Sequence, residues 1–246
     1  MVGRSRDAGA LGIVFLHGWR RDHRDWSRVI ELLDEELSVL TLDLPGFGDS
    51  DAPLVAIDSV GYAEAVAQVV REWREQVGLS RLIVVGHSFG GRVAIQLASV
   101  VAPELVDELL LVGVPIIRPQ SRAKSPLGYR LVRALAGIGL LSNERLESAR
   151  QRYGSDDYRH AVGVMREIFV KVVNEDYQEH FLMIDRPIWM LWGALDMACP
   201  VDLARRAANS STWATLEVLD GVHHLVPLED PESIAHMIKR VCNPSQ

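Results

Sequence analysis

The sequence predicts an α/β fold built on a doubly wound, mostly parallel sheet, and three observations support that fold class. Short apolar runs typical of strands buried on both faces alternate along the chain with segments of helical periodicity. One such run, residues 82–85, leads into a Gly-x-Ser-x-Gly pattern and then directly into an Ala-rich helical segment. Residues 116–185 interrupt the alternation with helix-prone sequence that contains no convincing strand. Alternation of this kind requires crossover connections, and therefore a parallel sheet covered by helices on both faces.

The expected strands are apolar runs closed by turn-forming residues. The first run ends at His17-Gly18, and the second enters a loop rich in Pro and Gly. The fourth is ended by Pro115. The runs occupy residues 12–16, 37–43, 81–87, 108–114, 187–193 and 214–220. Because ligands of such sheets bind at the carboxyl ends of the strands, we expect the functional residues in the loops that follow these runs.

The expected helices carry apolar residues at spacings of three and four. The helix over residues 59–77 is the clearest, because its apolar side chains share one face and Gly78 follows as a stop signal. The helix after the Gly-x-Ser-x-Gly pattern extends to residue 101, with Pro103 beyond it. The other expected helices cover residues 26–33, 201–208 and 231–241.

Residues 116–185 are expected to form a helical cap inserted after the fourth strand, so that residues 1–115 and 186–246 make up the core. The run from Arg118 to Arg133 holds five basic residues and no acidic one. It is either a solvated face or a site for an anionic substrate. Apolar cap residues, Tyr129 and Phe169 among them, either line an acyl pocket or form the cap's own small core.

Composition narrows the possible functions. The net charge of -7 provides no overall basic field for nucleic acid. Cys199 and Cys242 have no metal-like spacing and indicate no disulfide framework, which favours a reducing, cytoplasmic location. No apolar run is long enough to predict a membrane span or a signal peptide, so no membrane partner is expected. The oligomeric state stays open.

The Gly-x-Ser-x-Gly pattern, residues 86–90, is typical of a nucleophile elbow, a sharp turn between a strand and a helix. Gly86 and Gly90 lack a Cβ, so the strand and the helix can pack closely while Ser88 is held in a strained conformation with its hydroxyl exposed. The amide of Phe89, in the first helical turn, is free to donate to a developing oxyanion.

Together these motifs resemble the α/β-hydrolase fold family. His17-Gly18-Trp19 is similar to the family's loop after the first central strand, and residues 43–50 are similar to its D-x-P-G-x-G-x-S loop. The resemblance implies that Ser88 is the nucleophile and that the amides of Trp19 and Phe89 form the oxyanion hole. Family members usually have a β-hairpin before the first of these strands, but only about a dozen residues precede it here. We therefore expect the sheet to lack one or both edge strands.

The acid and the base follow Ser88 in the order that the family uses. Asp196, in a segment that resembles the family's W-G-x-x-D, is the expected acid. Of the adjacent His223 and His224, the spacing to Glu229 fits the family pattern only if His224 is the base. His223 then stands where relatives usually have glycine, and it either crowds the turn or touches the ligand. The residues expected to contact substrate are His17, Gly18, His223, Tyr129 and Phe169; an anchoring role beneath the oxyanion hole is the alternative for His17.

The predicted function is a serine hydrolase that cleaves a small or medium carboxylic ester through an acyl-enzyme, with no cofactor, no metal and a small-molecule ester or related acyl compound as its only partner. Serine at the elbow argues against relatives that use aspartate there, such as haloalkane dehalogenases and epoxide hydrolases. A carbon–carbon bond hydrolase or lyase is one alternative, because relatives with that activity share Gly90-Gly91-Arg92. Arg92 otherwise serves only in a surface ion pair. A ligand-binding receptor with weak turnover is the other alternative.

Overall fold

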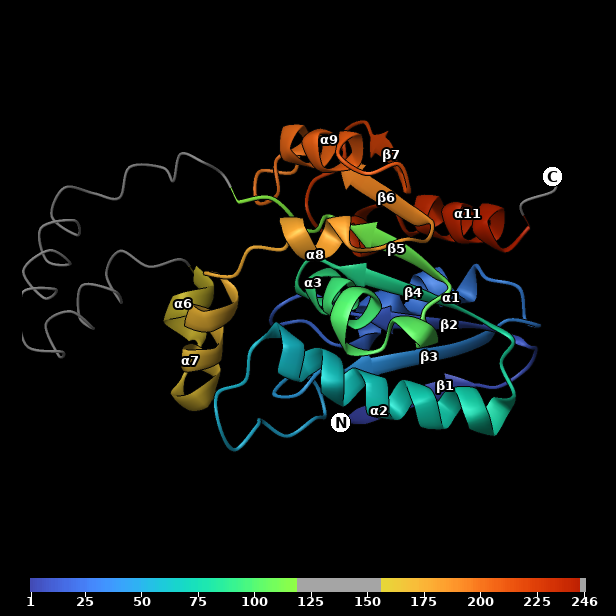
Figure 1. Ribbon diagram of the computed structural model, residues 1–246, viewed down its shortest axis with the longest axis horizontal. Coiled ribbons are helices and arrows are strands. Elements are labelled where there is room, and N and C mark those ends of the chain that lie inside the picture. The colour runs from blue at the N-terminus through green and yellow to red at the C-terminus, as the bar shows by residue number, and fades with distance from the viewer. Residues whose placement is uncertain (119–155, 244–246) are drawn as a thin grey trace, which may run out of the picture.

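The computed structural model of the chain describes residues 1–118 and 156–243. A seven-stranded sheet forms the centre of the molecule, with helices on both of its faces (Figure 1). The strand order is β1-β3-β2-β4-β5-β6-β7, and all neighbouring pairs are parallel except β1 and β3. The doubly wound, mostly parallel sheet predicted from the sequence is therefore confirmed.

Each of the six predicted strands forms, with small shifts at its ends. The predicted strands correspond to β2 (Leu11–Leu16), β3 (Ser38–Asp43), β4 (Arg81–His87), β5 (Glu108–Val112), β6 (Ile188–Gly193) and β7 (Ala214–Leu219). The seventh strand of the sheet is β1 (Val2–Arg6). No signal in the sequence predicts β1, because its residues are mostly polar and exposed and it forms by pairing with the distant β3. Within residues 1–118, one antiparallel strand precedes β2 where the family has a hairpin, as the short N-terminal segment predicted.

The helices pack on the sheet through two apolar clusters. Successive strand residues point to opposite faces, so Val14 joins the cluster under one set of helices and Ile13 joins the cluster under the other. The first cluster includes residues of α2 (Ser59–Val77), α3 (Phe89–Gln96), α8 (Gln178–Leu182) and α9 (Val201–Asn209). The second includes residues of α1 (Ser27–Glu31), α10 (Val226–Glu229) and α11 (Pro231–Cys242).

Two predicted helices are interrupted. A 3-10 turn, η1 (His23–Trp26), precedes α1 in the segment expected to be one helix. After α3 the chain widens into the π-helical turn η2 (Leu97–Val101), and the short η3 (Pro103–Leu105) follows. Periodicity locates these helices, but it does not distinguish an α-turn from the tighter or wider turns that tertiary packing imposes. No helix in the described part of the chain is long and apolar enough to cross a membrane.

The described part of the predicted cap is helical. It contains α6 (Asp156–His160), α7 (Gly163–Val172) and α8, after which the chain returns to the sheet at β6. In Figure 1, α6 and α7 lie beyond the carboxyl ends of the central strands. Tyr129 and most of the basic run fall outside the described residues, and the boundaries of a separate cap stay a prediction.

Candidate active site

Ser88 lies at the sharp turn between β4 and α3. Its backbone angles, φ 50° and ψ -109°, are in a region that residues other than glycine rarely adopt. The turn is tight because Gly86 and Gly90 allow close backbone contact: a Cβ on Gly90 would overlap the carbonyl oxygen of Leu16, and one on Gly86 would overlap the backbone of Gly91. The Ser88 amide donates to the carbonyl of Val112 at 2.9 Å, which fixes the turn to β5.

Ser88, His224 and Asp196 form one hydrogen-bonded chain. The carboxylate of Asp196 only accepts, so Nδ1 of His224 donates to its Oδ2 at 2.7 Å. Nε2 of His224 is then free to accept from the Ser88 hydroxyl, whose Oγ lies 3.0 Å away. The structure thus brings together the three residues that the sequence analysis assigned as nucleophile, base and acid. This is the arrangement needed to transfer a proton from a serine hydroxyl to an imidazole.

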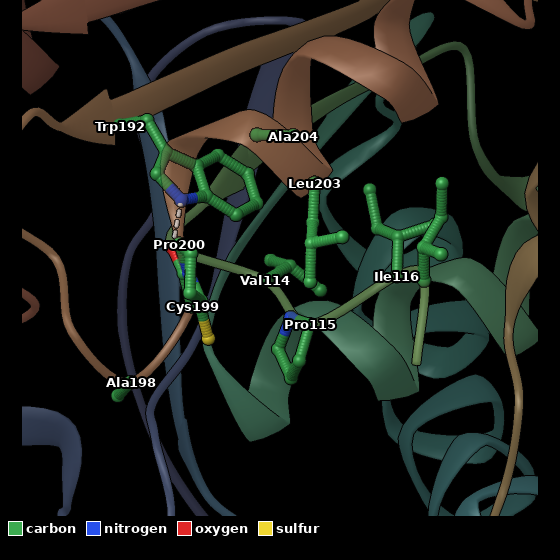
Figure 2. A pocket seen from close by; sticks show the side chains of 10 residues that line it. Val114, Pro115, Ile116, Trp192, Ala198, Cys199, Pro200, Leu203 and Ala204 are labelled. Atoms are coloured by element: carbon green, nitrogen blue, oxygen red, sulfur yellow. Dashed lines mark hydrogen bonds between the residues drawn. The ribbon is translucent and has the colours of Figure 1, made fainter. Parts of the chain in front are cut away.

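The loop after β6 holds the Asp196 side chain rigidly. Its Oδ1 accepts from the amides of Ala198 and Cys199 at 2.9 and 2.7 Å, and the side chain has no solvent exposure. Behind this loop lies a small, mostly apolar cavity of about 30 Å³ (Figure 2). Figure 2 shows the Trp192 indole donating to the carbonyl of Cys199, at 2.7 Å, beside this cavity. Asp196 is therefore oriented by its own loop, and one oxygen remains for His224.

His223 faces away from this chain of hydrogen bonds. Its side chain is 64% exposed, and its Nδ1 donates to Oε2 of Glu229 at 3.1 Å. Glu229 also accepts from the amides of His223 and Leu225, at 2.8 and 3.2 Å. These two hydrogen bonds fix the backbone on both sides of His224. These hydrogen bonds hold the pKa of Glu229 below its ordinary value. The substrate contact predicted for His223 is not supported by this geometry, because its ring pairs with Glu229.

His87 has a positioning role that the sequence analysis did not identify. Its ring is buried, and Nε2 donates to the backbone carbonyl of His224 at 2.9 Å. The two imidazole rings have centroids 5.0 Å apart. Burial lowers the pKa of His87 to about 3, so the ring is neutral near pH 7. His87, the residue before the nucleophile, is therefore hydrogen-bonded to the loop that carries the base.

His17 is an anchor and does not contact the cavity. Its ring is fully buried; Nε2 accepts from the amide of Leu44 at 3.0 Å, and Nδ1 donates to the carbonyl of Gly18 at 2.8 Å. Both nitrogens are occupied, so this geometry does not support the substrate contact predicted for His17 and favours its anchoring alternative. Gly18 is packed against the His87 ring, where an added Cβ would lie 2.9 Å from Nδ1. Gly18 is therefore packed against His87, and it is not among the residues that line the cavity containing Ser88, described below.

We predict that buried neutral histidines make folding stability depend on pH. The pKa values of His87 and His17 are both lowered by burial, whereas the unfolded chain protonates near pH 6.5. Below that pH the unfolded state therefore binds more protons than the folded state. The contribution of these histidines to the free energy of unfolding is fully present above pH 6.5 and is lost as the pH falls below 6.5. The slope from His87, whose pKa is lowered to about 3, should approach about 1.4 kcal/mol per pH unit, and His17 contributes in the same direction.

Urea unfolding between pH 8 and pH 5 measures this dependence, because most carboxylates remain ionised in that range. A His87→Gln variant, whose side-chain amide can still donate to the carbonyl of His224, should show a shallower slope. Equal stability of the wild-type protein at pH 7 and pH 5 would contradict a neutral buried histidine.

The residues predicted to form the oxyanion hole lie on either side of Ser88. Phe89 is the first residue of α3, so its N–H has no partner within the helix. Trp19 follows β2, and its ring packs edge-on against Phe89, with centroids 5.2 Å apart. Trp19, Ser88 and Phe89 line one cavity. The amide contacts to an oxyanion stay a prediction.

This cavity has a volume of about 300 Å³ as bounded by the described residues. Its wall is mainly apolar; the lining residues are Trp19, Ser88, Phe89, Arg92, Pro115, Asp157, Phe169, Val172 and Val173. Phe169, from α7, is thus placed where the sequence analysis expected it, with its ring 5.1 Å from that of Trp19. Arg92 also lines the wall, where the sequence analysis had offered a surface ion pair as one possibility. The sequence does not reveal this position, because the wall is formed by segments that lie far apart along the chain.

Two groups of side chains in the described residues have the composition of a metal site. Asp196, Cys199 and His224 form one group, and Asp22, His23 and Asp43 form the other; within each, the ligand atoms lie within 4.8 Å of one another. Their carboxylates already accept backbone amides, from Cys199 in the first group and from His23 in the second, both at 2.7 Å. These bonds explain both groups without an ion, and the expectation that no metal takes part stays a prediction.

Comparison with known proteins places this geometry in a family. A family model described as "Alpha/beta hydrolase family" matches residues 13–237. Epoxide hydrolase 1 of Caenorhabditis elegans is 24% identical over 272 residues; the match covers 95% of this chain and 65% of the nematode protein, so this chain spans about two thirds of that relative's length.

Solved structures share the fold at low sequence identity. A thermophilic esterase from Thermogutta terrifontis superimposes with a TM-score of 0.72 at 19% identity, covering 99% of this chain and 93% of the esterase. The meta-cleavage product hydrolase CumD from Pseudomonas fluorescens superimposes with a TM-score of 0.71 at 17% identity, covering 99% and 94% of the two chains. At these identities the likeness concerns the fold alone.

Proposed function

The chain belongs to the alpha/beta hydrolase family, and from this premise we propose that it is a serine hydrolase that cleaves a small or medium carboxylic ester through an acyl-enzyme. The single observation that carries the proposal is the chain of hydrogen bonds from Ser88 through His224 to Asp196. Nucleophile and base lie within hydrogen-bond reach, and a buried third group orients the base.

In the proposed first step, the Ser88 hydroxyl attacks the carbonyl carbon of the ester while Nε2 of His224 takes its proton. The amides of Trp19 and Phe89 stabilise the oxyanion that forms on the carbonyl oxygen. When the tetrahedral intermediate collapses, the imidazolium returns the proton to the alcohol oxygen, and the alcohol leaves. Asp196 stays ionised throughout and stabilises the imidazolium.

In the second step, water replaces Ser88 as the nucleophile. Nε2 of His224 takes a proton from the attacking water, the acyl–oxygen bond to Ser88 breaks, and the proton passes to the serine oxygen. The products are the carboxylic acid and the regenerated enzyme. No further reactant is required.

The cavity supports an ester substrate of modest size. Trp19, Phe89 and Phe169 line the same cavity as Ser88, and their aromatic side chains suit the apolar part of an acyl chain. Some relatives are named as epoxide hydrolases. The nucleophile position here holds a hydroxyl rather than a carboxylate, and we therefore propose ester hydrolysis for this chain.

The test is hydrolysis of p-nitrophenyl esters with acyl chains from C2 to C12. We expect a burst of p-nitrophenol followed by steady turnover, with the best kcat/KM at short or medium chain length because the cavity is small. Absence of turnover from folded protein would contradict the proposal. The carbon–carbon hydrolase and the receptor would then be the remaining candidates, and a thermal-shift screen would look for their ligands.

A further inference from the structure

The cavity beside Ser88 contains two hydrogen-bond donors that no described group satisfies. Nε of Arg92 and Nε1 of Trp19 are both buried and without a partner, and both residues line this cavity. A buried donor left without an acceptor destabilises the folded state, and a charged donor does so more strongly. Both donors belong to residues that line one cavity, which points to a ligand that is rich in acceptors.

The Arg92 side chain is held with one edge of its guanidinium free. Nη1 donates to the carbonyl of Val172 at 2.8 Å, and the guanidinium lies over the Tyr177 ring, 5.2 Å from its centroid. These contacts fix the plane of the group and account for one nitrogen. On the opposite side, Nε is buried without a partner and Nη2 donates in no hydrogen bond to a described residue. Since Nε has almost no accessible surface, Nη2 is the donor that a carboxylate in the cavity would meet.

No protein carboxylate serves as the partner among the described residues. Among the described residues that line the cavity, Asp157 alone is acidic, and its Oδ1 lies 3.5 Å from Nη1 of Arg20. Arg92 therefore brings a positive charge to the cavity wall without an ion-pair partner in the described chain. An anionic ligand group would satisfy the charge and the free donors together.

The position of Arg92 also sets the distance to the reaction centre. Arg92 follows Ser88 by one turn of α3, and its amide donates to the Ser88 carbonyl at 3.3 Å. Both residues line the same cavity of about 300 Å³, so a ligand that fills it contacts the guanidinium and the Ser88 hydroxyl through a short aliphatic spacer.

We infer that Arg92, with Trp19 beside it, binds a free carboxylate on the substrate, so that the ester hydrolysed at Ser88 is a half-ester of a short dicarboxylic acid. The inference rests on the proposed function and adds the substrate class to it. Arg118 is the described member of the basic run in the sequence, and it is partly buried and donates to the carbonyl of Asn174 at 2.8 Å. The anion specificity is thus assigned to the cavity and not to Arg118.

The test compares two ethyl esters with acyl chains of five carbons, monoethyl glutarate and ethyl pentanoate, by titrating the acid released. The wild-type protein should favour monoethyl glutarate by about 10- to 100-fold in kcat/KM, the range expected for a hydrogen-bonded charge pair. In Arg92→Gln this ratio should fall to near one. Arg92→Lys, which keeps the charge but replaces the planar guanidinium with a compact ammonium group, should give an intermediate ratio. The ratio is the readout because a general loss of activity lowers both rates.

Arg118→Gln is the matched control, since Arg118 also donates through Nη1 to a main-chain carbonyl after α7 but does not line the cavity. It should keep the wild-type ratio. Equal kcat/KM for the two esters in the wild-type protein would overturn the inference while leaving the hydrolase intact.

If neither ester is turned over, that result counts against the proposed function alone. A binding experiment then tests the inference. Glutarate should raise the Tm of the wild-type protein and of Arg118→Gln, and it should leave that of Arg92→Gln unchanged. An equal shift in Arg92→Gln, or no shift in any of the three proteins, would overturn the inference.

Discussion

Replacement of Ser88 with alanine is expected to lower kcat/KM for p-nitrophenyl butyrate by about 10⁴- to 10⁶-fold. The substitution removes the only hydroxyl that lies within hydrogen-bond distance of Nε2 of His224 among the described residues. Without it no acyl-enzyme forms, and the residual rate comes from binding and from the oxyanion donors alone. Initial rates over a range of ester concentrations measure the effect.

The fold should survive this substitution. Alanine occupies the strained backbone position with no larger side chain than serine, and only the hydrogen bond to His224 is lost, worth about 1 kcal/mol. Ser99→Ala is a suitable control, because Ser99 donates to the carbonyl of Ile95 and does not line the cavity. It should retain wild-type activity. A loss of less than tenfold in a folded Ser88→Ala protein would exclude Ser88 as the nucleophile.

Replacement of His224 with alanine should have an effect similar to that of Ser88→Ala, a loss of about 10⁴- to 10⁶-fold in kcat. Its ring contacts both the nucleophile and the acid, at 3.0 and 2.7 Å. His223 is the natural control, since it is the adjacent residue and has the same side chain. Its ring is exposed and paired with Glu229, so His223→Ala should change kcat by less than tenfold.

The pair of variants separates catalysis from loop structure. If the loop merely needs an imidazole for its conformation, both variants should lose similar activity and similar stability. A larger loss of kcat in His223→Ala than in His224→Ala would reverse the assignment of the base. Urea unfolding of each variant shows whether a change of stability accompanies the change of rate.

The fold and the three central residues were predictable because their signals are local in sequence. The strand over β4 is an apolar run, the turn at Ser88 requires Gly86 and Gly90, and both are visible without knowledge of distant contacts. His224 was chosen over His223 by its spacing to Glu229. The structure gives that spacing a physical meaning, because Glu229 accepts amides on both sides of His224.

The remaining features depend on contacts between distant parts of the chain. β1 exists through its pairing with β3, and a mostly polar segment gives no period-2 signal for such an edge strand. His87 reaches the carbonyl of His224, 137 residues away, and Arg92 reaches that of Val172, 80 residues away. Roles of this kind require the coordinates of both partners. His17 was assigned to the substrate because its loop lies at the site, although its ring points into the core.

Covalent labelling of the protein with an alkyl fluorophosphonate tests the central claim most directly. Such a reagent phosphonylates a serine only when an adjacent base removes its proton, so it reports on the activated nucleophile rather than on any particular substrate. We predict one adduct per chain by intact mass, located on the peptide that contains Ser88, and no adduct in His224→Ala. Labelling of another residue in place of Ser88, or no labelling of the folded wild-type protein, would contradict the account.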